Sequence, residues 1–451
     1  MAKKPAARKP VPGRAAVTRL LMPVQVLIRT ESASGVVLIA AALLAFAWAN
    51  SPWSASYFAI LEIPLGLGFG AWALEKPLLL WVNDLLMAVF FFLIGLEIKR
   101  EVLVGELAGW RRAALPIAGA VGGMVVPALI YVAFNLGTPN LRGWGVPMAT
   151  DIAFALGILA LLGERVPLAL KVFLLALAIV DDLGAVLVIA LFYTDSLSVG
   201  ALLWSFAAWG AALAYGRYGG ARALGFALIG AVMWYFMLKS GIHATIAGVL
   251  MALAVPLRHQ MPAQELQQEL RRLSGQGGSF EQVEMVIEHL EDVLARAHSP
   301  LHDIEHALAP YVAFVIMPVF AFCNAGVALG GTAGLAGPVA LGAALGLLLG
   351  KPLGVAGCAW LAVRSGITRL PEGASWPGIV GVGLLAGIGF TMSLFIASLA
   401  FGQSAELAQA KIGVLAASVV AALGGLAFLA RTLPRRSRPA AAARAGEAEA
   451  T

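Results

Sequence analysis

The stretch that decides the fold is Val172–Tyr193, VFLLALAIVDDLGAVLVIALFY, in which two adjacent aspartates interrupt an otherwise apolar run. At 1.5 Å per residue, a helix over this run is about 33 Å long, which is enough to cross the hydrocarbon core of a bilayer. Asp181 and Asp182 then lie close to the membrane midplane, where each charged side chain costs at least about 2.5 kcal/mol. Two such residues in succession indicate a binding site for a cation, a proton, or each in turn.

The composition is that of a multi-spanning membrane protein. Of the 451 residues, 60% are hydrophobic and 12% are charged, and the mean hydropathy is +0.86. The net charge of +6 does not indicate a nucleic-acid partner, because the basic residues are spread among short loops. Cys323 and Cys358 lie in apolar runs and are interpreted as buried small hydrophobic residues. The basic start could be a signal peptide, but Glu31 and the runs that follow favour a retained first span.

The hydropathy pattern predicts an all-α integral membrane protein with about twelve transmembrane helices. Long unbroken apolar runs fit helices, whose backbone hydrogen bonds are satisfied internally, better than closed strands. The twelve apolar runs are 33–50, 78–98, 114–134, 144–162, 168–193, 200–215, 221–237, 241–257, 308–329, 338–363, 377–402 and 409–430.

The basic residues predict the orientation of these spans. With the N-terminus inside, the outer loops contain only Lys76, Arg142, Lys239 and Lys411, as the positive-inside rule requires. Both termini are then cytoplasmic, and the number of spans is even. The predicted organisation is a basic cytoplasmic segment (1–30), spans 1–8 (31–257), a cytoplasmic helical insert (258–306), spans 9–12 (307–430) and a disordered cytoplasmic tail (431–451).

Spans 4 and 11 contain helix breakers. Gly143, Gly145 and Pro147 precede Thr150-Asp151 in span 4, and six Gly or Pro residues crowd 377–389 in span 11. Each span is the middle member of a trio, spans 3–5 and 10–12, and the two trios run in opposite directions. Interrupted helices in corresponding positions of inverted-topology repeats indicate the substrate site of a transporter. The alternative is that glycine only lets helices approach closely, which does not explain Thr150-Asp151 beside the break.

The ionisable residues inside the predicted spans form the candidate site. Adjacent helical residues point about 100° apart, so we expect one of the two central aspartates to meet a cation and the other to pair with a neighbour. Lys351 is the obvious counter-charge, because an unpaired buried lysine would lose its proton. Carboxylates suit alkali and alkaline-earth ions, so no transition metal or cofactor is expected. The ionisable residues of the spans are Asp84, Glu97, Asp151, Asp181, Asp182, His243 and Lys351.

Such a site can exchange a proton for a metal cation, because both compete for one carboxylate. Asp151 could neutralise the positive ends of the interrupted helices and Lys351 the negative ends. Other interpretations stay open for several of these residues. Asp151 could be only a helix N-cap, Asp84 and Glu97 could be structural or interfacial, and His243 could be a buried histidine with a satisfied hydrogen bond.

Five separated motifs resemble the NhaA family of bacterial sodium/proton antiporters, over about residues 20–430. Inverted repeats are an established property of that family, so the resemblance implies them independently of the breakers. The motifs are Val82–Glu101 (VNDLLMAVFFFLIGLEIKRE), Ala149–Gly157 (ATDIAFALG), Ala178–Gly184 (AIVDDLG), Leu238–Thr245 (LKSGIHAT) and Gly387–Ser393 (GIGFTMS).

The resemblance implies electrogenic exchange of cytoplasmic sodium or lithium for external protons at the bacterial inner membrane, activated at alkaline pH. Asp182 would be the principal cation ligand, and Asp181 would be its partner, paired with Lys351 in the proton-loaded state. Thr150 and Asp151 would lie where the interrupted helices cross, with Thr150 among the cation ligands. No cofactor is implied beyond the transported ions Na⁺, Li⁺ and H⁺.

The resemblance also implies regulation by pH and a dimer. Glu97, Glu305 and His306 would form a cytoplasmic pH sensor, with Asp84 and His243 as further modulating positions. The outer segment 51–78 resembles a periplasmic hairpin through which family members form homodimers.

Two departures from the family concern the pH set point. The second sensor histidine is Ala309 here, and the insert before span 9 is longer than expected. We hypothesise that the histidines of the insert contribute to sensing, with exposed histidines of no consequence as the alternative. These histidines are His259, His289, His298, His302 and His306.

Three other functions remain open from the residues alone. A transporter of organic solutes would need polar and aromatic groups at the midplane, where this chain places carboxylates and a lysine. An intramembrane aspartyl protease could pair Asp151 with Asp181 or Asp182, but such a dyad has no need of Lys351. A channel is disfavoured by the paired interrupted helices.

Overall fold

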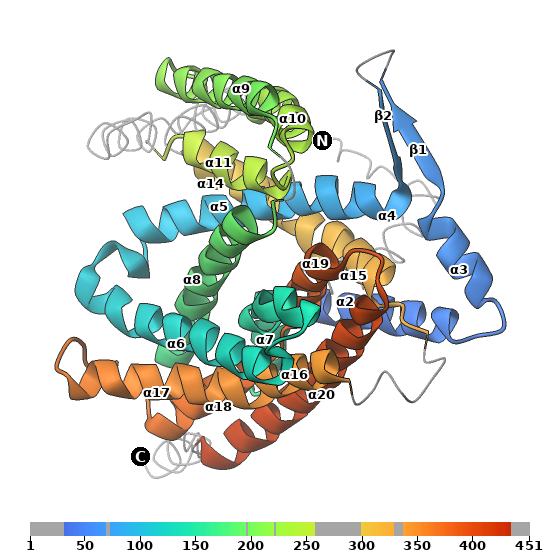
Figure 1. Ribbon diagram of the computed structural model, residues 1–451. Helices are drawn as coiled ribbons and strands as arrows, with labels where there is room; N and C mark the ends of the chain where they lie inside the picture. The colour runs from blue at the N-terminus through green and yellow to red at the C-terminus, as the bar shows by residue number, and fades with distance from the viewer. Residues whose placement is uncertain are drawn as a thin grey trace, which may run out of the picture.

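The computed structural model describes residues 31–68, 73–194, 197–220, 222–257, 299–328 and 337–433. The predicted N-terminal segment, most of the predicted insert with His259, His289 and His298, and residues 434–451 of the predicted tail lie outside these ranges. Within them the chain is almost entirely helical, with one antiparallel strand pair (Figure 1).

The elements follow the predicted runs closely. In chain order they are α2 (Glu31–Ala49), α3 (Ser54–Leu61), β1 (Pro64–Leu67), β2 (Leu74–Pro77), α4 (Leu78–Trp81), π-helical η2 (Val82–Leu86), α5 (Met87–Leu103), 3₁₀-helical η3 (Glu106–Ala108), α6 (Trp110–Asn135), 3₁₀-helical η4 (Pro139–Met148), α7 (Ile152–Ala160), 3₁₀-helical η5 (Gly163–Arg165), α8 (Leu168–Phe192), α9 (Val199–Arg217), α10 (Ala223–Ser240), α11 (Thr245–Ala254), α14 (Pro300–Tyr311), π-helical η6 (Val312–Ile316), α15 (Met317–Ala325), α16 (Pro338–Leu345), π-helical η8 (Gly346–Gly350), α17 (Lys351–Arg364), α18 (Trp376–Ala386), α19 (Phe390–Phe401) and α20 (Ala405–Thr432).

The helices confirm a multi-pass all-α protein, while the number of twelve spans stays a prediction. Among the described residues, nine helical stretches are long and apolar enough to cross a membrane, or eleven if each of two bent pairs counts as one span. The bent pairs are α2 with α3, at 117°, and α18 with α19, at 45°. In predicted span 8, α11 has only ten residues. The small β-hairpin is the one departure from an all-helical chain in the described ranges.

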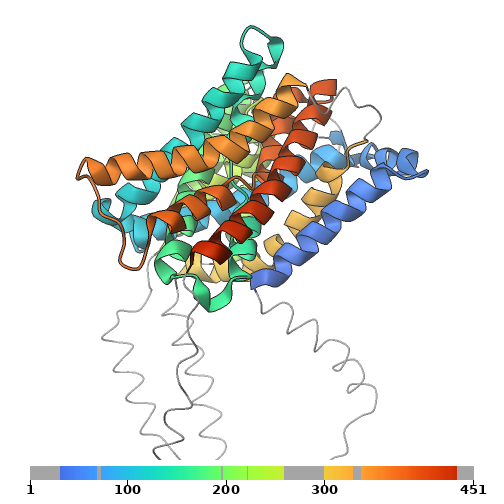
Figure 2. The same ribbon diagram turned by 90° about the horizontal axis from the view of Figure 1, so that it is seen from below.

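Glycines let the central helices approach each other closely. A Cβ atom added at Gly354 of α17 would meet the carbonyl oxygen of Gly122 of α6. Likewise, a Cβ added at Gly95 of α5 would lie 2.7 Å from the Cβ of Ala252 in α11. Small residues give membrane helices this backbone-to-backbone packing, for which lipid provides no hydrophobic driving force. In Figure 2, the orange and red helices α17, α18 and α20 lie side by side.

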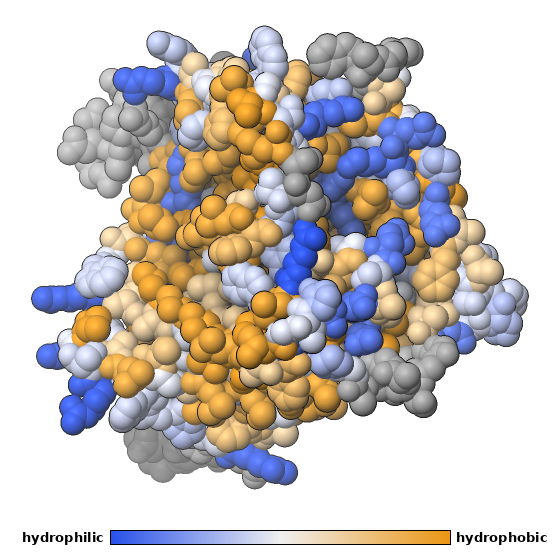
Figure 3. Space-filling model, in the orientation of Figure 1, coloured by the Kyte–Doolittle hydropathy of each residue, from blue (hydrophilic) through white to orange (hydrophobic). Residues whose placement is uncertain are grey.

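The surface fits a lipid environment. Large apolar side chains are exposed on the outer helices, such as Leu203 (65%) and Trp204 (64%) on α9 and Leu423 (64%) on α20. Figure 3 shows this apolar colour over most of the visible face. The hairpin of β1 and β2 pairs Pro64 with Pro77 through Leu67 with Leu74, within the predicted outer segment 51–78. Helices α9, α10 and α11 lie at one side of the fold (Figure 1) and share a second buried apolar cluster with Leu96 of α5 and Leu301 and Ile304 of α14.

Candidate ion-binding site

A buried ion pair lies at the centre of the fold. Asp181, midway along α8, accepts a hydrogen bond from the ammonium of Lys351, the first residue of α17, with 2.5 Å between Nζ and Oδ2. Neither side chain is exposed. The structure therefore forms the ion pair that the sequence indicated for Lys351, with Asp181 as the partner.

Asp182 beside this pair has a different environment. It is 1% exposed, and within the described residues neither of its carboxylate oxygens has a hydrogen-bond partner. The Oδ1 atom of Asp181 is likewise buried without a partner. A buried carboxylate is costly unless it holds a proton or a cation. One aspartate is thus held by a lysine while three carboxylate oxygens remain available to a small ligand.

Close helix packing places Lys351 at this depth. Gly123 of α6 lies beside the lysine and lets α17 approach closely, since an added Cβ would lie only 2.9 Å from Cγ2 of Val355. One residue before the lysine, an added Cβ at Gly350 would lie 2.7 Å from the Cα of Pro127. The π-helical turn η8 ends directly before Lys351. Such turns re-aim the following side chains and are frequent at functional sites.

The two predicted helix breaks lie against each other. Residues 149–151 separate η4 from α7, and residues 387–389 separate α18 from α19. The Asp151 amide donates to the carbonyl of Ile388 (2.7 Å), and the Thr150 hydroxyl donates to the carbonyl of Ala386 (2.9 Å). Asp151 therefore joins the two breaks through its backbone, and Thr150 joins them through its side chain.

The carboxylate of Asp151 binds the start of both following helices. Its Oδ1 accepts from the amide of Phe154 in α7 (3.0 Å), and its Oδ2 accepts from the amide (3.2 Å) and the hydroxyl (2.5 Å) of Thr391 in α19. The N-cap interpretation of Asp151 is thus confirmed for α7. Because a helix N-terminus carries a partial positive charge, one carboxylate faces two such charges.

Two residues of this crossing were not singled out from the sequence. Thr391 binds Asp151, and Ser418 of α20 accepts a hydrogen bond from the amide of Phe390 (3.1 Å) at the start of α19. A hydroxyl residue directly after the break in GIGFTMS was the available signal for Thr391, since such side chains bind near helix starts. Ser418 had no local signal, because its partner is 28 residues away.

The residues predicted to sense pH gather at one end of α5. Arg100 binds Glu305 of α14 (3.1 Å between Nε and Oε1) and Glu101 (3.0 Å). Glu97 lies one helical turn before Arg100 on α5. His306 follows Glu305 on α14, and its ring centroid lies 6.4 Å from that of His302. The structure brings these residues together, and their role in sensing stays a prediction.

The other two modulating positions have local partners. Asp84, in the π-helical turn η2, forms an ion pair with Lys76 of β2 at 2.7 Å, and its carbonyl accepts from the indole of Trp234 (3.0 Å). The Nε2 atom of His243 lies 2.7 Å from the carbonyl oxygen of Tyr193. These contacts favour the structural interpretations of both residues.

The carboxylate oxygens at the central site that have no hydrogen-bond partner within the described ranges are hard ligands, which suit a hard cation. Among the described residues, no group of three or more His, Cys, Asp or Glu side chains is arranged to hold a metal. A sodium ion at Asp182 would therefore complete its shell with hydroxyl, carbonyl or water oxygens, which are its preferred hard ligands.

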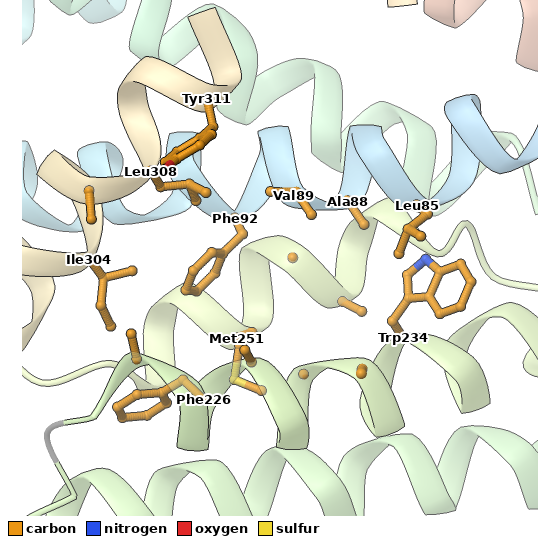
Figure 4. A pocket seen from close by; sticks show the side chains of 17 residues that line it. Leu85, Ala88, Val89, Phe92, Phe226, Trp234, Met251, Ile304, Leu308 and Tyr311 are labelled. Atoms are coloured by element: carbon orange, nitrogen blue, oxygen red, sulfur yellow. The ribbon is translucent and has the colours of Figure 1, made fainter. Parts of the chain in front are cut away.

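A separate cavity of about 440 Å³ lies between α5, α10, α11 and α14 (Figure 4). Its wall is apolar, with Phe92, Phe226, Met251 and Trp234 facing it, and it offers nothing to a cation.

Comparison with known proteins gives matches over nearly the whole chain. The sequence model of the family described as Na⁺/H⁺ antiporter 1 matches residues 25–429. A protein of Oleidesulfovibrio alaskensis named Na(+)/H(+) antiporter NhaA is 50% identical over 95% of this chain and 98% of its own length. Proteins of the same name from Koribacter versatilis and Rhodospirillum rubrum are each 49% identical, over 91% and 92% of this chain and 93% and 99% of their own lengths.

Proposed function

Because this chain belongs to the Na⁺/H⁺ antiporter 1 family, we propose that it expels Na⁺ or Li⁺ in exchange for external protons across the bacterial inner membrane. An antiporter is a secondary transporter and not an enzyme, so the protease alternative falls. Membership of this family also excludes the channel and the transporter of organic solutes as alternatives. The finer features of the proposal are electrogenic exchange, activation at alkaline pH, twelve spans with both termini in the cytoplasm, and a homodimer formed through segment 51–78.

The observation that carries this proposal is the unpartnered carboxylate of Asp182 beside the Asp181–Lys351 pair. In the proton-loaded state, Asp182 holds a proton, which makes its burial tolerable. A sodium ion that reaches the site needs the negative charge of Asp182, so the proton leaves as the ion binds. Competition for one carboxylate, exposed to each side of the membrane in turn, is sufficient for exchange.

Lys351 provides a physical reason for electrogenic exchange. A cation bound beside Asp181 competes with the ammonium for that carboxylate. A buried ammonium that loses its counter-charge releases its proton. One sodium ion would then displace two protons, one from Asp182 and one from Lys351, and each cycle would move net charge.

The crossing of the helix breaks supports roles for Thr150 and Asp151. The Thr150 hydroxyl uses its hydrogen on Ala386, which leaves its oxygen lone pairs available as a cation ligand. Asp151 supplies negative charge to two helix starts and keeps them together. Glu97 of α5, with Glu305 and His306 of the neighbouring α14, is proposed to set the pH at which the site becomes accessible.

Exchange in everted membrane vesicles tests the proposal. A preset pH gradient is followed with a fluorescent probe, and added Na⁺ or Li⁺ should collapse it in vesicles that contain the wild-type protein. Asp182→Asn should abolish the response, whereas the exposed-site control Glu62→Gln should retain it. Normal exchange by Asp182→Asn would show that the site is assigned wrongly. Clamping the membrane potential with valinomycin and K⁺ should change the rate if exchange moves net charge.

A further inference from the structure

A large cavity lies at a different place from the ion site, where three connecting segments meet. It has a volume of about 960 Å³ and is bounded by the connection between α5 and α6, the first turns of α8, and the connection between α17 and α18. In the predicted orientation all three segments are cytoplasmic. The cavity has a charged rim and an apolar floor, and neither part belongs to the exchange mechanism above.

Three arginines dominate the rim. Arg111 and Arg112 lie in the first turn of α6, and Arg369 lies between α17 and α18. All three are exposed, and none of them forms an ion pair within the described ranges. The Thr368 hydroxyl donates to the carbonyl of Arg111 (3.3 Å), which fixes the two arginine-bearing segments side by side.

The rim keeps an excess of positive charge. Glu106 and Glu372 share it with the three arginines, so the lining charges sum to one positive. A guanidinium presents a fork of donors that matches a phosphate group, and it stays charged at all relevant pH values. The rim therefore favours a phosphate-bearing ligand over a cationic one.

The floor is apolar and reaches into the membrane region. Leu115 (1% exposed), Phe173 (2%) and Ala176 (3%) form its buried part. At the mouth, the apolar side chains of Leu168 (75%) and Ile367 (56%) are exposed. Along α8 the wall runs from Leu168 to Ala176, about 12 Å of helix. That length is comparable to the hydrocarbon thickness of one leaflet, about 15 Å.

An aromatic residue marks the depth of the rim in the bilayer. Trp110, next to Arg111 at the start of α6, is 71% exposed. Exposed tryptophans at the ends of membrane helices lie at the level of the lipid headgroups. Arginines at that depth face headgroup phosphates, and the apolar floor below them faces acyl chains.

We propose that this cavity binds an anionic phospholipid of the adjacent leaflet. Its phosphate lies among Arg111, Arg112 and Arg369, and one acyl chain follows α8 over the apolar floor. Basic pockets between membrane helices on the cytoplasmic side recognise anionic headgroups in this way. A soluble phosphate compound would leave the apolar floor uncovered. A lipid without net charge would leave the positive charge of the arginine rim unbalanced.

The test uses the full-length protein, purified and stripped of lipid in detergent. Native mass spectrometry follows the binding of dioleoylphosphatidylglycerol, with the zwitterionic dioleoylphosphatidylcholine, whose headgroup has no net charge, as the comparison. The anionic lipid should bind and the zwitterionic lipid should bind much more weakly. Each Arg→Gln change at the rim should weaken binding about fivefold, the contribution of one basic residue near a membrane surface. Equal binding of both lipids would overturn the proposal.

A matched control removes the same charge elsewhere. Arg217, Arg364 and Arg431, which lie in the last turns of α9, α17 and α20 and outside the cavity lining, are replaced together by Gln. This triple variant should bind the anionic lipid as the wild type does, whereas the triple variant of the rim should lose more than a hundredfold. Equal losses in the two triple variants would show a general effect of net charge and overturn the site.

Two further variants separate a phospholipid from other occupants. Ala169→Phe on α8 places a bulky side chain in the apolar wall and keeps all three arginines. It should remove lipid binding, and glycerol phosphate should bind no more tightly than it does to the wild type. If glycerol phosphate alone binds as well as the lipid, the ligand is a soluble phosphate. A chain ended at residue 433 should bind the lipid unchanged, and a large gain would identify residues 434–451 as the occupant. Sodium-driven exchange and thermal unfolding of each variant report whether it is folded.

Discussion

Removal of the lysine from the central ion pair should destabilise the protein strongly. In Lys351→Met, a side chain of similar length stays in place while Asp181 loses its counter-charge at a site with no exposure. Breaking a buried ion pair by removing one partner costs about 3–5 kcal/mol, because an uncompensated charge remains. We expect Lys351→Met to lose this amount when Asp181 is ionised.

The sign of the pH dependence follows from the same contact. In Lys351→Met, Asp181 can stay buried by taking up a proton, so the folded variant holds more protons than the unfolded chain. Stability then falls as pH rises, by up to about 1.4 kcal/mol per pH unit. The double variant Asp181→Asn, Lys351→Met carries neither charge, so it should recover most of the loss and show no such slope.

Thermal unfolding in detergent, followed by tryptophan fluorescence at several pH values, measures these changes. Lys76→Met is the matched control, because it breaks an ion pair with Asp84 whose side chains are 27% and 19% exposed. A partly exposed pair contributes about 0–1 kcal/mol, so this variant should unfold close to the wild type. If Lys351→Met unfolds like the control, or if the double variant is no more stable than Lys351→Met, the reasoning is wrong.

Three further outcomes are expected. Thr391→Val removes the hydroxyl that binds the carboxylate of Asp151 and should lower stability by about 1.5–3 kcal/mol, the usual contribution of a hydrogen bond to a charged group, measured by thermal unfolding. Gly354→Ala should destabilise the protein by about 1–3 kcal/mol because its Cβ meets backbone of α6, whereas Gly357→Ala on the same helix has open space and should not; equal effects would contradict the close packing. In vesicles, the sodium concentration for half-maximal exchange should rise about tenfold per unit of falling pH where binding displaces one proton, and up to about a hundredfold where it displaces one proton each from Asp182 and Lys351; a constant value would exclude competition between sodium and protons at the site.

The central site was largely predictable from the sequence, because its signal is local. Two aspartates and one lysine in long apolar runs stand out whatever their tertiary contacts. The residue pattern alone did not assign Lys351 to Asp181 rather than to Asp182, and only the family resemblance implied that pairing. Helical geometry separates the two aspartates by about 100° but does not say which neighbour each one faces.

Of the contacts of Asp151, one was predictable from the sequence and the other was not. An aspartate before an apolar run is an N-cap signal, and the bond to Phe154 three residues later fulfils it. The bond to Thr391 joins residues 240 positions apart. Such a contact depends on how the two helix breaks pack, which no local pattern encodes.

Hydropathy predicts which segments are apolar, but it does not predict where the helices in those segments bend or end. It placed every predicted run on a helical element, but it could not show that α2 turns by 117° into α3 or that α11 is only ten residues long. The small β-hairpin also has no hydropathy signal, because its strands are only four residues each and lie at the edge of the apolar runs.

The carboxylate that Asp151 shares between two helix starts limits how the protein can change shape. Separating α7 from α19 would break hydrogen bonds to a buried charge and leave two helix dipoles without their common anion. The two half-helices should therefore travel as one rigid unit when the ion pathway switches sides. Flexing would then be confined to the joints at the far ends of that unit, where a slow step of the transport cycle should be sought.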